Sequence, residues 1–157
     1  MPAFVLPLPH WPLPRGVRHI DGVVLQPKDE LHVTLANAAL VAELAAAVPG
    51  DVHGWLQRLW EAGDTRVLVT GSELLLHKRP DRALYHAGSW SIIVPVRLPG
   101  QELLLRRLEC RLGRQLPRPP AHVTRWVAGR PQGIGLPRPA LLRRYLCAGT
   151  SGSAAPG

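Results

Sequence analysis

Cysteine is scarce in this chain of 157 residues, which contains only Cys110 and Cys147. Two cysteines without a paired spacing argue against a disulfide framework and a cysteine-based metal site, and they favour a reducing compartment such as the cytoplasm. Long apolar runs are also absent, since no stretch reaches the ~18 residues that a membrane span needs. The apolar start at 4–9 is broken by prolines and lacks a basic leader, so we expect a soluble, cytoplasmic protein with no membrane partner.

Lysine and acidic residues are also few. Of the 19 basic residues, 17 are arginine, and the formal net charge is +8. From residue 105 onward the chain has ten arginines and a single acid, Glu109. A positive field in this third of the chain would attract anionic ligands, including RNA or DNA bound through phosphates. No recognisable nucleic-acid-binding signature accompanies this charge, so it indicates an anionic ligand without identifying it.

The tripeptide His-Val-Thr occurs twice, at 32–34 and at 122–124, within two segments typical of β-strands. Side chains alternate between the two faces of a strand, so each copy places a histidine and a threonine on one face and a valine on the other. Most single histidines have no chemical role, but an identical pair of motifs is rare in a chain of this composition. If the two strands lie together, two imidazoles and two hydroxyls meet in one cleft, which suits a phosphate with a proton to move at each end.

These motifs resemble those of the 2H phosphoesterase superfamily, the group of 2′-5′ RNA ligase-like proteins and cyclic phosphodiesterases. That family is defined by two His-x-[Thr/Ser] motifs about half a chain apart, and it is matched here within 30–35 and within the Pro-rich 119–124. The stretch Gly-Ile-Gly-Leu at 133–136 is also similar to the tail of one bacterial branch. The chain departs from the pattern at Arg125, where an apolar residue is usual. By alternation Arg125 should point away from the cleft, toward solvent or a carboxylate.

The resemblance implies an α+β fold with two lobes, in which antiparallel sheets line a central cleft and helices pack outside. It also implies a metal-independent phosphoesterase with no cofactor, acting on 2′,3′-cyclic phosphates or 2′-5′ linkages of nucleotides or RNA ends, by hydrolysis or by ligation. His32 and His122 would be the general acid and base, in an order that the sequence leaves open. Thr34 and Thr124 would donate hydrogen bonds to the non-bridging phosphate oxygens.

Three further residues are weaker candidates for substrate contacts. Trp126 lies four residues after His122, so regular alternation predicts it on the same face, where it would stack on a nucleobase or pack at the rim of the cleft. Arg79 and Arg130 are candidates for phosphate or ribose contacts.

Two other functions stay open. The same fold could serve as a module that binds RNA or a nucleotide without turnover. Alternatively, His32 and His122 could join a third histidine, His77 or His86, in a transition-metal site. We expect a monomer, although no feature of the sequence determines the oligomeric state.

The chain length predicts one domain over 20–147, with a Pro-rich extended arm at 1–19 and a disordered tail at 148–157. Apolar periodicity and turn residues predict strands and helices. The expected strands are 22–26, 31–35, 66–70, 73–77, 89–98 and 121–127, and the expected helices are 38–48, 52–62, 101–112 and 139–146.

Some finer expectations accompany these elements. Strands 22–26 and 31–35 are candidates for one hairpin, and 66–70 and 73–77 for another. Pro95 favours an edge position or a bulge for its strand. The helical spacing of Trp55 and Trp60 predicts that both belong to the core rather than to a base-stacking platform.

Overall fold

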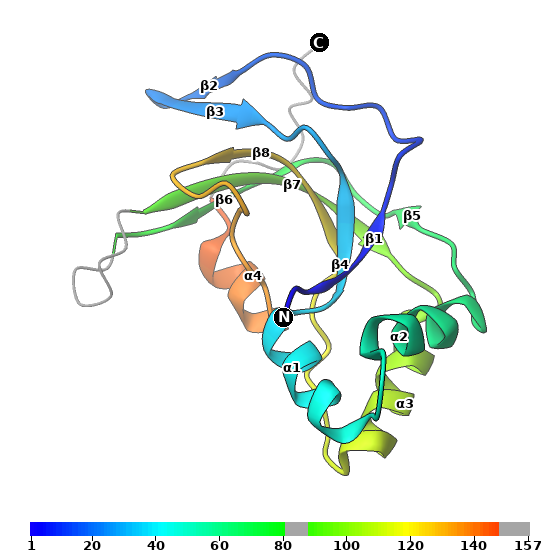
Figure 1. Cartoon of the computed structure of the whole chain (residues 1–157). Coiled ribbons are helices and arrows are strands. Elements are labelled where there is room, and N and C mark those ends of the chain that lie inside the picture. Colours follow the sequence, from blue (N-terminus) through cyan, green and yellow to red (C-terminus); the bar gives the residue numbers. More distant parts are fainter. Residues whose placement is uncertain (81–87, 148–157) are drawn as a thin grey trace.

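The computed structural model of the chain (Figure 1) describes residues 1–80 and 88–147. Within them the protein has a curled antiparallel sheet of eight strands and four helices, which confirms the α+β class of the expected fold. The expected disordered tail, 148–157, lies outside the described residues. The strands are β1 (Phe4–Pro7), β2 (Arg18–Ile20), β3 (Val23–Pro27), β4 (His32–Ala36), β5 (Leu68–Val69), β6 (Leu74–Lys78), β7 (Ser89–Arg97) and β8 (His122–Ala128). The helices are α1 (Ala38–Ala47), α2 (Val52–Glu61), α3 (Gln101–Leu112) and α4 (Pro139–Tyr145).

Strand β8 is the centre of the sheet. One of its edges pairs with β7 along its whole length, and the other edge pairs with β4 and then with β3. β1 lies outside β4, β2 lies outside β3, and β5 and β6 share the outer edge of β7. Helices α1, α2 and α3 group on one side of the curled sheet, while α4 packs near β6 (Figure 1).

The two hairpins predicted from the sequence are wrong. β3 and β4 both run antiparallel to β8 along one edge, so the turn between them carries the chain onward instead of reversing it. Likewise, β5 and β6 do not pair with each other, because the long strand β7 gives both an edge to bind. The observed hairpin joins β2 to β3 through Asp21 and Gly22, whose φ angles are both positive (48° and 80°). An Asp-Gly pair between two strands is a strong hairpin signal, so the sequence did contain this information.

The N-terminal arm is extended, as expected, but it is not separate from the domain. Its residues 4–7 form β1, which is hydrogen-bonded to β4. The backbone N–H of Leu8 also donates to the carbonyl of Leu31 over 2.9 Å. The arm therefore adds a strand beside the first His-Val-Thr segment.

Pro95 occupies an interior strand rather than an edge strand, contrary to expectation. β7 has partners on both sides, and its irregularity falls at Ile92 and Ile93 rather than at Pro95. The carbonyl oxygen of Pro95 accepts a hydrogen bond from the N–H of Thr70. The nitrogen of Pro95 therefore faces the same edge of β7, in the gap between β6 and β5, and this nitrogen has no hydrogen to donate. The proline is tolerated there because that gap needs no ladder donor.

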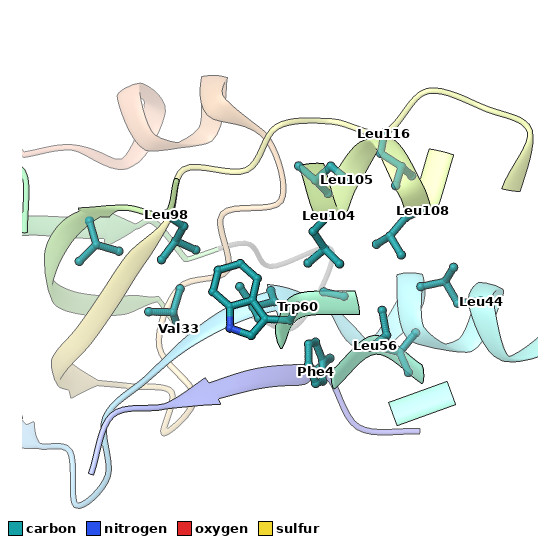
Figure 2. Close-up of a cluster of buried hydrophobic side chains, with 14 of the residues drawn as sticks. Phe4, Val33, Leu44, Leu56, Trp60, Leu98, Leu104, Leu105, Leu108 and Leu116 are labelled. Atoms are coloured by element: carbon teal, nitrogen blue, oxygen red, sulfur yellow. The ribbon is translucent and has the colours of Figure 1, made fainter. Parts of the chain in front are cut away.

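The main core fills the space between β1, β4 and β8 and the helices α1, α2 and α3 (Figure 2). Val33 and Val123, the central residues of the repeated tripeptide, are fully buried in it, as the alternation predicted. Trp60 is only 2% exposed, which confirms it as a core residue, while Trp55 is partly buried and packs against the margin of the same cluster. In the ranges 1–80 and 88–147 no helix has the length and apolar character needed to span a membrane.

Candidate active site

The two His-Val-Thr segments lie side by side in the sheet. Val33 of β4 is paired with Val123 of β8 in an antiparallel register. Continuing that register by one residue in each direction sets His32 opposite Thr124 and Thr34 opposite His122. Diagonal neighbours in such a pair lie about 7–8 Å apart, which leaves room for a phosphate between the two imidazoles.

A single cavity of about 400 Å³ is lined by all four motif side chains, His32, Thr34, His122 and Thr124. Its volume falls in the range of about 300–1,000 Å³ that is usual for small-molecule sites. Other parts of its wall come from α1, from α3 and from the segments 116–120 and 132–137. The sequence-based expectation that the motifs share one cleft therefore agrees with the geometry.

The ring of His122 is held in one orientation by the backbone. Its Nδ1 lies 2.9 Å from the carbonyl oxygen of Pro120, so Nδ1 carries the hydrogen and donates it, and Nε2 is left unprotonated in the neutral ring. Burial lowers the pKa of His122 below its ordinary value, and a charge on His32 lowers it further, against the opposing effect of the Pro120 hydrogen bond. His122 is therefore a neutral ring with an available lone pair at pH 7, which is what a general base requires.

His32 has a different environment. Its side chain is 30% exposed, and its Nδ1 is buried with no hydrogen-bond partner among the described residues. The carboxylate of Glu30 is nearby, with Oε1 at 3.5 Å from that Nδ1. Glu30 is itself highly exposed, and a small rotation of its side chain would let it accept the Nδ1 hydrogen and orient the ring. The sequence analysis did not single out Glu30, which lies in the bend just before β4 and is brought near the ring by that bend.

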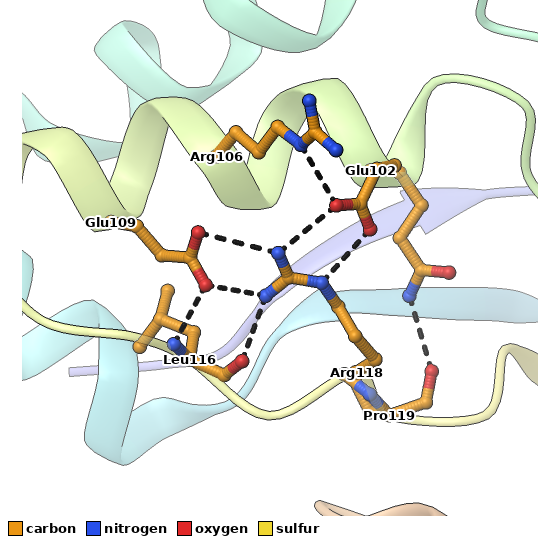
Figure 3. A network of polar contacts seen from close by, with 7 residues as sticks. Glu102, Arg106, Glu109, Leu116, Arg118 and Pro119 are labelled. Carbon is orange, nitrogen blue, oxygen red and sulfur yellow. Dashed lines mark hydrogen bonds and ion pairs between the residues drawn. The ribbon is translucent and has the colours of Figure 1, made fainter.

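Arg118 fixes the Pro-rich segment that precedes β8 (Figure 3). Its guanidinium donates to the carboxylates of Glu102 and Glu109, both on α3, and to the carbonyl of Leu116. These hydrogen bonds lower the pKa of Glu102 and lower that of Glu109 to about 2. Since Pro120 orients His122, this network anchors the segment that positions the ring. Sequence reasoning missed it, because residues so far apart along the chain give no periodic signal.

The segment after β8 packs against Thr124. The N–H of Ile134 donates to the buried hydroxyl of Ser91 over 3.0 Å. Gly133 has a φ of 79°, and a Cβ at that position would lie only 3.1 Å from Cγ2 of Thr124. A glycine is thus needed both for the backbone conformation and for the close approach. This gives a structural reason for the Gly-Ile-Gly-Leu stretch noted in the sequence.

Trp126 does not share the face of His122, so that prediction is wrong. The register passes from the pair Ile93 and Thr124 directly to the pair Ile92 and Trp126, which leaves Arg125 as an extra residue. Such a β-bulge interrupts the alternation and sends Trp126 to the opposite face. Alternation over one irregular strand could not predict this.

Behind the sheet, Trp126 is 6% exposed and packs with Leu25 of β3. Its Nε1–H donates to the carbonyl of Gly16 over 3.0 Å, and the guanidinium carbon of Arg18 lies 4.8 Å from its ring centroid. Arg125 does point away from the cavity, as expected, but among the described residues it forms no ion pair with a carboxylate. Its guanidinium carbon instead lies 5.3 Å from the ring centroid of Trp126.

The remaining candidates also lie outside the cavity. Arg79 and Arg130 are exposed, and neither contributes to the cavity wall. His77 stacks on Trp90 with 4.2 Å between ring centroids, on the face of the sheet opposite His122, so it does not join the two motif histidines. His86 lies outside the described residues, and within the described part no cluster of three or more His, Cys, Asp or Glu is suited to a metal ion.

The chain matches no protein-family model, no curated protein and no solved structure. Membership of the 2H superfamily accordingly remains a hypothesis, which depends on the two motifs and on the cavity that they share.

Proposed function

We propose that the protein is a phosphoesterase of the 2H type, with the two-lobed fold of that superfamily, which opens 2′,3′-cyclic phosphates or cleaves 2′-5′ linkages in nucleotides or RNA ends. The observation that carries this proposal is that both histidines and both threonines of the repeated motif line one cavity. We also propose a cytoplasmic location, since the chain has only two cysteines and they lack the paired spacing of a disulfide framework.

The proposed reaction needs two proton transfers. Nε2 of His122 takes a proton from water as its oxygen attacks phosphorus. The bond between phosphorus and one ribose oxygen breaks, and the other ring, His32, donates the proton that this oxygen requires. Thr34 and Thr124 donate hydrogen bonds to the non-bridging oxygens, where negative charge increases in the transition state. The two imidazoles carry out both proton transfers, so the proposed reaction requires no metal ion.

The test is turnover by the purified wild-type chain, with a chelator present, of uridine 2′,3′-cyclic phosphate, a cyclic-phosphate RNA end and a 2′-5′ dinucleotide. We expect hydrolysis of at least one of them, with substantial loss in His32→Ala. His19→Ala is the matched control, because His19 is an exposed strand residue outside the cavity. Binding of these compounds without any turnover by the wild type would contradict catalysis and favour the binding module.

Replacement of Arg118 is expected to slow the reaction, although this side chain does not contact the substrate. In Arg118→Met the segment bearing Pro120 loses its anchor to α3, and misplacement by about 1 Å costs up to about 10²-fold in rate. Because the Pro120 hydrogen bond raises the pKa of His122, loosening it should also move the acid limb of kcat/KM to lower pH. The measurement is the pH profile of kcat/KM, with Arg118→Lys as partial rescue.

The matched control is Arg106→Met. Arg106 is another partner of Glu102, but it does not contact the Pro-rich segment.

A measurement of stability separates the two variants further. The pKa of Glu109 is depressed to about 2 in the folded chain, so its stabilising effect is present above its unfolded pKa and fades as the pH falls toward 2. The difference in the free energy of unfolding between wild type and Arg118→Met should therefore become smaller below about pH 4.5. An unchanged pH profile of kcat/KM in this variant would show that Arg118 does not position His122.

A further inference from the structure

The cavity has two chemically different parts. The polar part consists of the four motif side chains together with the amides of Asn37 and Gln132. The rest of the described lining is largely leucine and proline, mainly Leu40, Leu105, Leu116, Pro117, Pro119 and Leu136. No arginine, lysine, aspartate, glutamate, phenylalanine, tyrosine or tryptophan is among the described residues that line it.

The apolar wall is rigidly held. Leu105 and Leu116 are buried members of the main core (Figure 2). Leu40 packs against the same cluster. The segment that carries Leu116 is also fixed by the Arg118 network described above. A wall of this kind does not rearrange to present polar groups to a ligand, so its apolar character is a property of the bound state as well.

Among the described residues, the wall of the cavity offers no charged side chain to a second phosphate group. Arg118 stands between the lining residues Pro117 and Pro119 in the sequence, but it is already paired with both Glu102 and Glu109, which offset its charge. The exposed arginines Arg130 and Arg138 do not line the cavity. A second anionic group seated among the leucines would be desolvated without a counter-charge, which is strongly unfavourable. Among the described lining residues there is also no phenylalanine, tyrosine or tryptophan ring on which a nucleobase could stack.

We infer that the preferred substrate is a cyclic phosphodiester with a single negative charge and an uncharged, apolar substituent, which lies against the leucine and proline wall. This inference rests on the proposed function and makes it narrower. A substrate with further phosphates, such as an RNA end or a 5′-phosphorylated cyclic nucleotide, is disfavoured. The excess of arginine on the surface then contributes to general attraction of anions rather than to recognition inside the site.

The first test is a series of cyclic phosphates of alkane-1,2-diols, from two to eight carbons, assayed with the wild-type chain alongside uridine 2′,3′-cyclic phosphate. Burial of each methylene group against the wall should raise kcat/KM about four-fold until the cavity is full. A robust turnover that does not depend on chain length would overturn the inference and leave the proposed function intact. If the wild-type chain turned over no member of the series and not the uridine compound either, both the inference and the proposed function would be rejected.

The second test places a cation on the apolar wall. Wild type should prefer uridine 2′,3′-cyclic phosphate over its 5′-phosphorylated form by about ten-fold or more, and Leu40→Arg should reduce that preference and flatten the chain-length series. Leu103→Arg is the matched control, since Leu103 is an exposed leucine of α3 outside the cavity. Thermal unfolding of both variants verifies that they fold. Equal effects of the two substitutions, or a wild-type preference for the 5′-phosphorylated compound, would contradict the inference.

Discussion

Replacement of His122 by alanine is expected to lower kcat/KM for a cyclic phosphodiester by about 10²–10⁴-fold, the range typical of general acid–base catalysis. The structure places this ring in the cavity with Nδ1 engaged by the Pro120 carbonyl and Nε2 available. The loss should appear in kcat more than in KM, because proton transfer contributes to the transition state and not to the ground state. Steady-state kinetics on wild type and variant provide the measurement.

The pH dependence gives an independent test of the same assignment. A general base must be unprotonated, so the acid limb of the kcat/KM profile should fall ten-fold per pH unit below the pKa of His122. Since burial depresses that pKa, the half-maximal point of the acid limb should lie below the ordinary value of about 6.5. Added imidazole should restore part of the activity of His122→Ala by taking up the missing proton transfer. An acid limb centred well above 6.5, or a variant as active as wild type, would contradict the role.

The sequence predicted best what depends on local chemistry. α3 has the bounds expected from its leucine spacing, and it ends at Gly113, whose φ of 70° is accessible to glycine at little cost. A helix was expected at 38–48, and α1 is Ala38–Ala47, with Asn37 accepting a hydrogen bond from the N–H of Leu40 at its start. Within each motif the histidine and the threonine face the cavity together because strand alternation holds locally around Val33 and Val123. These features are encoded within a few residues of one another.

The pairing of strands that are far apart along the chain was harder to predict from the sequence. Which edge accepts β3, β4, β5 and β6 depends on competition among distant strands, and the true hairpin at Asp21 and Gly22 was overlooked. The bulge at Arg125 moved Trp126 to the other face, although a charged residue in a place that is usually apolar was the one visible sign of irregularity. The Arg118 network joins residues on two separate elements through charge geometry, for which a single sequence offers no pattern.

Replacement of Trp60 by alanine is expected to reduce the free energy of unfolding by about 3–5 kcal/mol, as is usual when a buried tryptophan is truncated. The side chain is 2% exposed and lies at the centre of the main core, between α2 and α3 (Figure 2). For a chain of this size the corresponding fall in Tm is about 6–20 °C. Urea and thermal unfolding provide the measurement, and an unchanged m-value would show that the denatured state is not the cause.

Two other substitutions test the reason for that loss. Nε1 of Trp60 is buried without a hydrogen-bond partner among the described residues, so Trp60→Phe keeps most of the ring volume and removes an unsatisfied donor. It should therefore cost much less than Trp60→Ala. Trp55→Ala should also cost less, because that ring is only partly buried at the margin of the same cluster. If Trp60→Phe were as destabilising as Trp60→Ala, the stability would depend on the indole N–H rather than on the volume that the ring fills, and the packing argument would fail.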